Sequence, residues 1–404
     1  MTYAHTLLKR AVRGLLLVAI LGMLVAAQKA QAQTFTTLYG FTGGFDGGTP
    51  SDGIVLDAQG DVYGTTQSGG AGRCKLGCGT LFKLTPNGTE TVIYSFPAGA
   101  KSGASPGLIW DTKGNLYGTT IGTPKGPYGA VFELTNQAKA KWRYLFKQTV
   151  DGDIPDGVLF MDTKGNLYGT TLEGGAYGDG TVFQVTPKRI ETVLHSFGSS
   201  GSDGMEPLAG LVSDLQGNLY GTTLLGGSND VGTVYKITPG GTETVIYNFS
   251  GEMDGAGPSA GMIFDAQSNL YGTTLEGGGG SLCSKGVFPG CGTVFKLDPN
   301  GTETVLYRFT GGADGAGPLS LVLDNKGNLY GTTVEGGASN RGTVYEITAA
   351  GTEEVLYSFT GGTDGQFPGN LVMDAQGNLY GTTSSGGGYV CQQHGCGTVF
   401  KLKP

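Results

Sequence analysis

The chain has 404 residues, of which 77 are glycine, whereas charged residues make up only 14% and the apolar set 38%. Glycine is usually about 7% of a globular protein, so this composition argues against a helical protein. Collagen is excluded because glycine does not recur at every third position and only 16 residues are proline. Disorder is excluded by the 19 tyrosines and 18 phenylalanines in ordered patches. The composition predicts a β protein with many turns.

Residues 1–32 are typical of a secretory signal peptide. Basic residues at positions 9–13 precede an apolar run from Leu15 to Ala27, and Ala30-Gln31-Ala32 fits the small-x-small cleavage pattern. An uncleaved membrane anchor is the alternative, but the run is shorter than the roughly 20 residues that span a bilayer. We expect cleavage near Gln33 and a secreted or periplasmic protein without a later transmembrane span.

The net charge limits the class of partner. The formal charge of −8 includes four cationic residues in the predicted signal, and their removal leaves 21 cationic against 33 acidic residues, or −12. An acidic chain without a basic stripe is a poor nucleic-acid binder, because that affinity comes mostly from Lys and Arg on phosphates. Cations, neutral glycans and basic partners are compatible with this charge.

One unit of about 52 residues repeats along the chain. Its mark is Tyr-Gly-Thr-Thr, which occurs seven times, beginning at Tyr63, Tyr117, Tyr168, Tyr220, Tyr271, Tyr330 and Tyr380. Each unit has four strand-like runs separated by turn residues, and the fourth unit has them at Gly210–Asp214, Asn218–Thr223, Gly232–Thr238 and Thr242–Phe249. Short connections indicate antiparallel meanders. The pattern predicts four-stranded blades of a seven-bladed β-propeller over residues 33–404, in one domain.

The phase of the repeat predicts how the ring closes. The chain after residue 32 begins with a run of the fourth type, Thr34–Phe41, and ends with one of the third type, Gly397–Leu402. Pairing of these two runs would complete the last blade and hide sheet edges that invite aggregation. A linear β-solenoid is the alternative, but it gives no reason for complementary ends.

The run Asp374-Ala-Gln-Gly-Asn-Leu-Tyr-Gly-Thr-Thr383, together with strands such as Gly397-Thr-Val-Phe-Lys-Leu402, resembles the GloVer-type tandem repeat family of exported bacterial proteins. The resemblance covers essentially all of the chain after residue 32. It implies export and the repeat fold, and it implies no general activity. Members often carry C-terminal sorting anchors, whereas this chain stops at Lys403-Pro404, so we expect release or periplasmic residence.

An aspartate ends the first run of every unit and is followed by x-x-Gly, or by x-x-Ser268 in the fifth unit. These residues are Asp57, Asp111, Asp162, Asp214, Asp265, Asp324 and Asp374. A metal site is one interpretation, but a turn in which Asp accepts local hydrogen bonds and Gly takes a positive φ explains the pattern better. We expect the repeated tyrosines and the fourth-run aromatics, such as Phe249, to pack between blades rather than stack on a ligand.

A second set of carboxylates follows the fourth run in a Gly-Gly-x-Asp-Gly-x-x-Pro loop, and it contains Asp46, Asp151, Asp203, Asp254, Asp314 and Asp364. Strand alternation places these loops on the same face as Glu173, Glu276 and Glu335. Asp-Gly turns account for this pattern. The alternative is a polar ligand surface or a site for a divalent cation such as Ca²⁺ at the mouth of the channel, although the oxygen spacing is not that of a calcium loop. We expect no other cofactor.

The six cysteines form three local pairs, each in a loop between the second and third runs: Cys74 and Cys78, Cys283 and Cys291, Cys391 and Cys396. In an exported protein this pattern predicts three disulfides that stiffen one face. Zinc is the alternative, but His394 is the one histidine nearby and no four-ligand cluster occurs. We expect this stapled face to bind the ligand.

No catalytic residue is predicted. The Asp-x-x-Gly-Asn-Leu-Tyr run is similar to that of sugar-lactonase and streptogramin-lyase propellers, whose sites place polar residues around the channel. Here the first runs are apolar, as in Ile54-Val-Leu56, and His195 stands at an outer packing position. We expect a monomeric binding module for a glycan, an envelope component or a protein. The alternative is a cation-dependent hydrolase or lyase at the channel mouth.

Overall fold

The computed structural model describes residues 33–72, 74, 77–97, 107–123, 126, 128–147, 150–280, 282–283, 288–388, 391 and 395–404. The predicted signal peptide at 1–32, residues 98–106 in the loop that leads into the second unit, and His394 lie outside this range. Within it, the protein is all-β, and no helix occurs that could cross a membrane.

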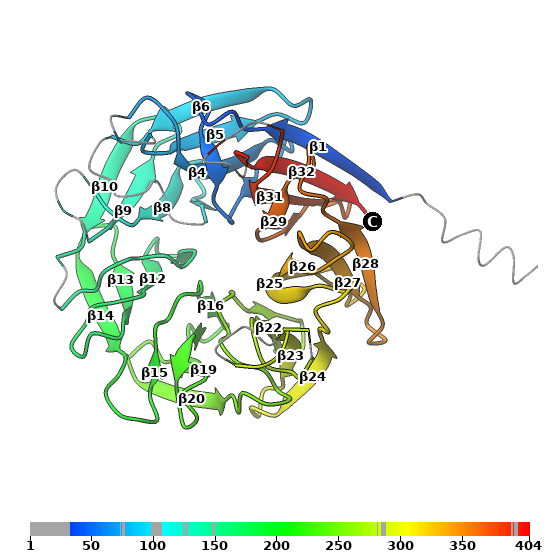
Figure 1. Ribbon diagram of the computed structural model, residues 1–404. Coiled ribbons are helices and arrows are strands. Elements are labelled where there is room, and N and C mark those ends of the chain that lie inside the picture. Colours follow the sequence, from blue (N-terminus) through cyan, green and yellow to red (C-terminus); the bar gives the residue numbers. More distant parts are fainter. Residues whose placement is uncertain are drawn as a thin grey trace, which may run out of the picture.

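Seven antiparallel sheets stand in a ring, as predicted (Figure 1). From the channel outward, the strands of the first four blades are β3 (Val55–Leu56), β4 (Val62–Ser68), β5 (Thr80–Leu84) and β6 (Glu90–Ser95); β7 (Ile109–Trp110), β8 (Leu116–Thr120), β9 (Ala130–Leu134) and β10 (Ala140–Leu145); β11 (Phe160–Met161), β12 (Leu167–Thr171), β13 (Thr181–Val185) and β14 (Glu191–Ser196); β16 (Val212–Ser213), β17 (Leu219–Thr223), β19 (Thr233–Ile237) and β20 (Glu243–Asn248).

The last three blades follow the same order. They contain β21 (Ile263–Phe264), β22 (Leu270–Thr274), β23 (Thr293–Leu297) and β24 (Glu303–Arg308); β25 (Ala316–Leu323), β26 (Leu329–Glu335), β27 (Thr343–Ile347) and β28 (Glu353–Ser358); β30 (Val372–Met373), β31 (Leu379–Ser385), β32 (Thr398–Lys403) and β1 (Thr34–Gly40). Short loop strands add β2 (Gly48–Pro50), β15 (Gly204–Met205), β18 (Leu225–Gly226) and β29 (Gln366–Pro368).

The predicted ring closure is confirmed. The first strand, β1, pairs antiparallel with the last, β32, from Thr34 opposite Lys403 to Gly40 opposite Thr398, and both lie together in Figure 1. Aromatic side chains hold β1 to the blades on either side. Phe35 stacks on Tyr357 of blade 6 with ring centroids 3.8 Å apart, and Phe41 meets Phe82 of blade 1 edge to face at 5.1 Å.

The core depends on one aromatic ring in the third strand of each blade. This ring lies over the glycine of Tyr-Gly-Thr-Thr in its own blade, in the pairs Gly64–Phe82, Gly118–Phe132, Gly169–Phe183, Gly221–Tyr235, Gly272–Phe295, Gly331–Tyr345 and Gly381–Phe400. The same ring meets an outer-strand phenylalanine of the preceding blade, with centroids 4.9 to 5.5 Å apart. The glycine therefore makes room for the contact that joins neighbouring blades.

The aspartate that ends the first run shapes a turn, as predicted. In blade 4, Asp214 Oδ1 accepts hydrogen bonds from the backbone N–H of Gln216 and Asn218, and Oδ2 accepts them from Asn218 Nδ2 at 2.6 Å and Tyr220 Oη at 3.0 Å. Gly217 follows with φ of 81°. The tyrosine hydroxyl bonds the turn aspartate in all seven blades. These residues are therefore part of the scaffold.

The innermost strands are shorter than the sequence predicts. The run Gly210–Asp214 pairs only over Val212–Ser213, and the other inner strands, except β25, are also two residues long. The segment before several of these strands pairs instead with the far end of the second strand, as β2 and β29 do. In blade 6 both parts form one strand, β25, with a register shift between Pro318 and Leu321. In these blades the segment before the first run thus belongs to the loop face, and only two residues of the run pair at the channel wall.

Replacement of Gly272 by alanine tests the packing against the third-strand ring. A Cβ at Gly272 would lie 2.6 Å from Phe295 Cζ and 3.2 Å from Met262 Cγ, so Gly272→Ala is expected to lower the free energy of unfolding by about 1–3 kcal/mol. Gly201→Ala is the control, because nothing lies within 4 Å of the added methyl group. Denaturant unfolding measures both variants, and equal stabilities would contradict this account of the core.

Candidate functional site

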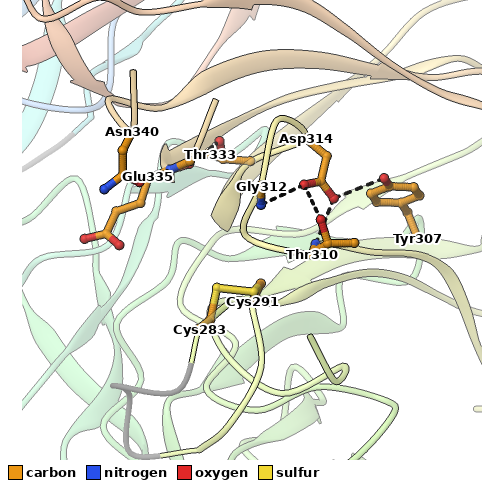
Figure 2. The surroundings of a disulfide bond; sticks show 10 residues. Cys283, Cys291, Tyr307, Thr310, Gly312, Asp314, Thr333, Glu335 and Asn340 are labelled. Atoms are coloured by element: carbon orange, nitrogen blue, oxygen red, sulfur yellow. Dashed lines mark hydrogen bonds between the residues drawn. A yellow bond between two sulfur atoms is a disulfide. The ribbon is translucent and has the colours of Figure 1, made fainter. Parts of the chain in front are cut away.

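The six loop aspartates bond to their own loops. Asp314 is an example: its carboxylate accepts hydrogen bonds from Tyr307 Oη at 3.2 Å, from the N–H and hydroxyl of Thr310 at 2.7 Å each, and from Gly312 N–H at 3.2 Å (Figure 2). The equivalent contacts to the outer strand are Tyr39–Asp46, Tyr144–Asp151, His195–Asp203, Tyr247–Asp254 and Tyr357–Asp364. These hydrogen bonds order the loops, and they turn the carboxylates toward the outer strands.

A glutamate from the next blade lies beside most of these aspartates. It opens the outer strand of that blade, and the five pairs are Asp46–Glu90, Asp151–Glu191, Asp203–Glu243, Asp254–Glu303 and Asp314–Glu353. In each of these glutamates Oε1 is buried without a hydrogen-bond partner among the described residues. We call each meeting of outer-strand tyrosine or histidine, loop aspartate and next-blade glutamate a rim joint.

Burial changes the ionisation of the rim-joint glutamates. Desolvation, followed by the nearby aspartate charge, raises the pKa of Glu90, Glu191 and Glu303 to about 7. At neutral pH each therefore holds a proton for part of the time. The sequence did not predict these glutamates as interacting groups, because their aspartate partners lie about 40 residues away in the preceding blade.

Two of the three predicted loop glutamates line one groove between blades 5 and 6. The groove has a volume of about 580 Å³, and Glu276, Glu335, Asn340 and the Cys283–Cys291 disulfide line it together with apolar side chains. In Figure 2, Glu335 and Asn340 lie to the left of the Cys283–Cys291 disulfide, and Asp314 lies to its right. Glu276 Oε2 also accepts a hydrogen bond of 2.7 Å from Phe288 N–H. The third glutamate, Glu173, belongs to blade 3 and is exposed.

The three predicted disulfides are confirmed. The bonded pairs are Cys74–Cys78, Cys283–Cys291 and Cys391–Cys396, and each lies between the second and third strands of its blade. Because every cysteine sulfur is in a disulfide, none is a thiolate that could bind zinc. Disulfides of this kind are typical of proteins in oxidising compartments.

The central channel contains a cavity of about 450 Å³ with mostly apolar walls. Its lining includes two carboxylates that the sequence analysis missed, Asp52 and Asp156, as well as Asn370. Desolvation raises the pKa of Asp52. These two residues could have been found from the variation among repeats just after the loop proline. Asp52 and Asp156 lie at or next to the position that is Leu208 or Ser259 in other units.

A family model matches most of the chain. The Gloeobacter/Verrucomicrobia repeat matches residues 74–288 and 280–404, so the chain belongs to this repeat family. No match occurs among the curated proteins.

Solved structures are similar in fold. One is the extracellular domain of a protein named as a hybrid two-component system of B. thetaiotaomicron, with 15% identity over 92% of this chain and a TM-score of 0.58. Another is the extracellular domain of a one-component system of the same organism, with 11% identity over 90% of the chain and a TM-score of 0.57. This chain spans 41% and 39% of those two chains. A gluconolactonase of Xanthomonas campestris matches at a TM-score of 0.44 with 15% identity, over 94% of this chain and 92% of its own. A match at this level says nothing about the activity of this chain.

The rim joints predict a pH dependence of stability. A glutamate whose pKa is 4.5 unfolded and about 7 folded stabilises the protein most when protonated, so stability is expected to fall as pH rises from 4.5 through 7. We expect a loss of roughly 1 kcal/mol per glutamate, allowing for solvent screening. Denaturant unfolding at pH 5 and pH 8 measures it.

The variant for this test is Glu90→Gln, Glu191→Gln and Glu303→Gln combined, which should remove most of the difference between the two pH values. Glu354→Gln is the control, since this side chain is exposed on the outer strand β28. An unchanged difference in the triple variant would show that the rim joints do not cause the pH dependence.

Proposed function

We propose that this protein is an exported binding module that takes a ligand bearing positive charge into the groove between blades 5 and 6. The observation that carries the proposal is the convergence of Glu276 and Glu335 on one groove of about 580 Å³, with Asn340 beside them. The Cys283–Cys291 disulfide forms part of the wall. A covalently closed wall limits the loop motion that a ligand must otherwise suppress, and this lowers the entropic cost of binding.

The charge of the groove supports a basic protein segment as the ligand. Its described lining has two glutamates and no lysine or arginine, and the whole chain carries 33 acidic against 25 basic residues. Complementary charge favours encounter with a basic partner and disfavours an acidic one. Apolar side chains such as Leu275, Leu282 and Val334 offer contact to the aliphatic stems of lysine or arginine. We therefore favour a segment of an envelope or extracellular protein over a neutral glycan.

Export is part of the proposal. The three disulfides fit an oxidising compartment, and residues 1–32 have the pattern of a cleavable signal peptide. Together they support a periplasmic or extracellular location for residues 33–404.

A second candidate function is hydrolysis or elimination on a small molecule in the channel, and Asp52 is the observation that favours it. Its carboxyl group lines a cavity of about 450 Å³, and its raised pKa suits an acid or base. The described lining contains no histidine and few other polar groups. This candidate therefore has less support than the binding module.

A binding screen tests the groove. The protein is titrated with synthetic lysine- and arginine-rich peptides and applied to an array of neutral oligosaccharides. We expect peptide binding that weakens with salt and that falls at least about tenfold in Glu335→Gln, because one charge-assisted contact contributes roughly 1.5–3 kcal/mol. Glu354→Gln, at an exposed position on β28, is the matched control and should bind as the unaltered protein does. Salt-independent glycan binding would contradict the proposed ligand class.

A lactone-hydrolysis assay with added Ca²⁺, Mg²⁺ or Zn²⁺ tests the second candidate. If the channel is catalytic, Asp52→Asn should reduce turnover by about 100-fold or more, whereas Glu335→Gln should leave it unchanged. Turnover that survives Asp52→Asn would exclude this aspartate as the catalytic group.

A further inference from the structure

One rim joint differs from the others in its chemistry. Four of the five joints that have both carboxylates use a tyrosine from the outer strand: Tyr39, Tyr144, Tyr247 and Tyr307. In the joint between blades 3 and 4 the same position holds His195. Since the blades repeat one plan, this substitution places an imidazole where the scaffold needs only a hydrogen-bond donor.

The histidine joint brings three ligand atoms together. His195, Asp203 and Glu243 each direct one nitrogen or oxygen atom into a group whose members all lie within 4.8 Å of one another. The three residues come from β14, from the loop after β14 and from β20 of the next blade. The site is therefore assembled by the packing of two blades, and neither blade holds all three groups alone.

The surroundings of Asp203 fix its carboxylate. The residue is buried, and Oδ2 accepts hydrogen bonds from Ser199 N–H at 3.0 Å and Ser199 Oγ at 2.8 Å. With Oδ2 held by Ser199, Oδ1 is the oxygen that faces the imidazole of His195.

The hydrogen-bonding groups of this joint are only partly paired by the described residues. His195 Nε2 lies 3.4 Å from Asp203 Oδ1, whereas a charge-assisted N–H···O hydrogen bond is usually about 2.7–2.9 Å long. Glu243 Oε1 is buried and has no hydrogen-bond partner among the described residues. Oε1 is also unpartnered among the described residues in the other four joints, so the imidazole within 4.8 Å of both carboxylates is what distinguishes this joint as a candidate cation site.

We propose that His195, Asp203 and Glu243 form a binding site for a divalent transition-metal ion such as Zn²⁺. One imidazole and two carboxylates are common zinc ligands, and the two carboxylate charges balance the ion. Two donors on one tetrahedral Zn²⁺ lie roughly 3.4 Å apart, which is the separation of the His195 and Asp203 atoms. A rotation of the Glu243 side chain completes the set. The 16% exposure of the His195 side chain leaves access for a water ligand.

Metal titration of the untagged, chelator-treated protein tests this site. Zn²⁺ binding is followed by calorimetry, and Co²⁺ is used as a spectroscopic probe of tetrahedral coordination. We expect one equivalent to bind. In His195→Tyr affinity should fall by about 100-fold or more, because loss of a ligand costs at least as much as loss of its supporting contacts. That variant carries the residue of the other joints, so it is expected to fold, and it retains His394.

A pair of glutamate variants separates coordination from general charge. Glu243→Gln should weaken Co²⁺ binding and change its visible absorption, whereas Glu303→Gln, at the same place in a joint with Tyr247, should change neither. The proposal is overturned if the unaltered protein binds neither ion, if His195→Tyr binds as well as the unaltered protein, or if both glutamate variants lose binding equally.

Discussion

A ring of blades has no terminal blade, and this constraint determines how the whole chain is arranged. Blade 7 obtains its outer strand from the other end of the chain, since β1 pairs with β32 over Thr34–Gly40. Without that pairing, blade 7 would expose the edge of β32, and the interfaces of blade 7 with blades 6 and 1 would be incomplete. Phe35 and Phe41 show the consequence in packing, because the first contacts blade 6 and the second contacts blade 1.

Seven blades can close into a ring because every interface between neighbouring blades uses the same packing contact. An aromatic ring such as Phe295 fits over Gly272 in its own blade and meets Phe249 of the preceding blade. This contact brings the outer strands of neighbouring blades close enough for a loop aspartate to meet the next blade's glutamate. The rim joints are thus a product of core packing. At His195 and Asp52 the residue differs from that of the other repeats. Each side chain therefore brings a different functional group to a position that the packing of the blades already fixes.

The features predicted from sequence were those encoded within one repeat or in its phase. The Tyr-Gly-Thr-Thr period indicated seven four-stranded blades, the ends of the chain indicated closure, and paired cysteines in single loops indicated the disulfides. The direction of Asp314 toward Tyr307 and the approach of Glu353 were not predicted, because they depend on contacts between residues of different strands and blades. The two-residue inner strands were not predicted because Gly210–Asp214 has the composition of one continuous strand, although only Val212 and Ser213 pair with β17.

Native-state hydrogen exchange measured strand by strand tests the closed ring most directly. If the ring is closed, the amides of β32, which lies between β31 and β1, should exchange as slowly as those of β27, which lies between β26 and β28. Removal of residues 33–41 should then raise exchange first in β32 and β31. Fast exchange throughout residues 398–403 of the unaltered protein, with slow exchange in β27, would show that β1 does not close the ring.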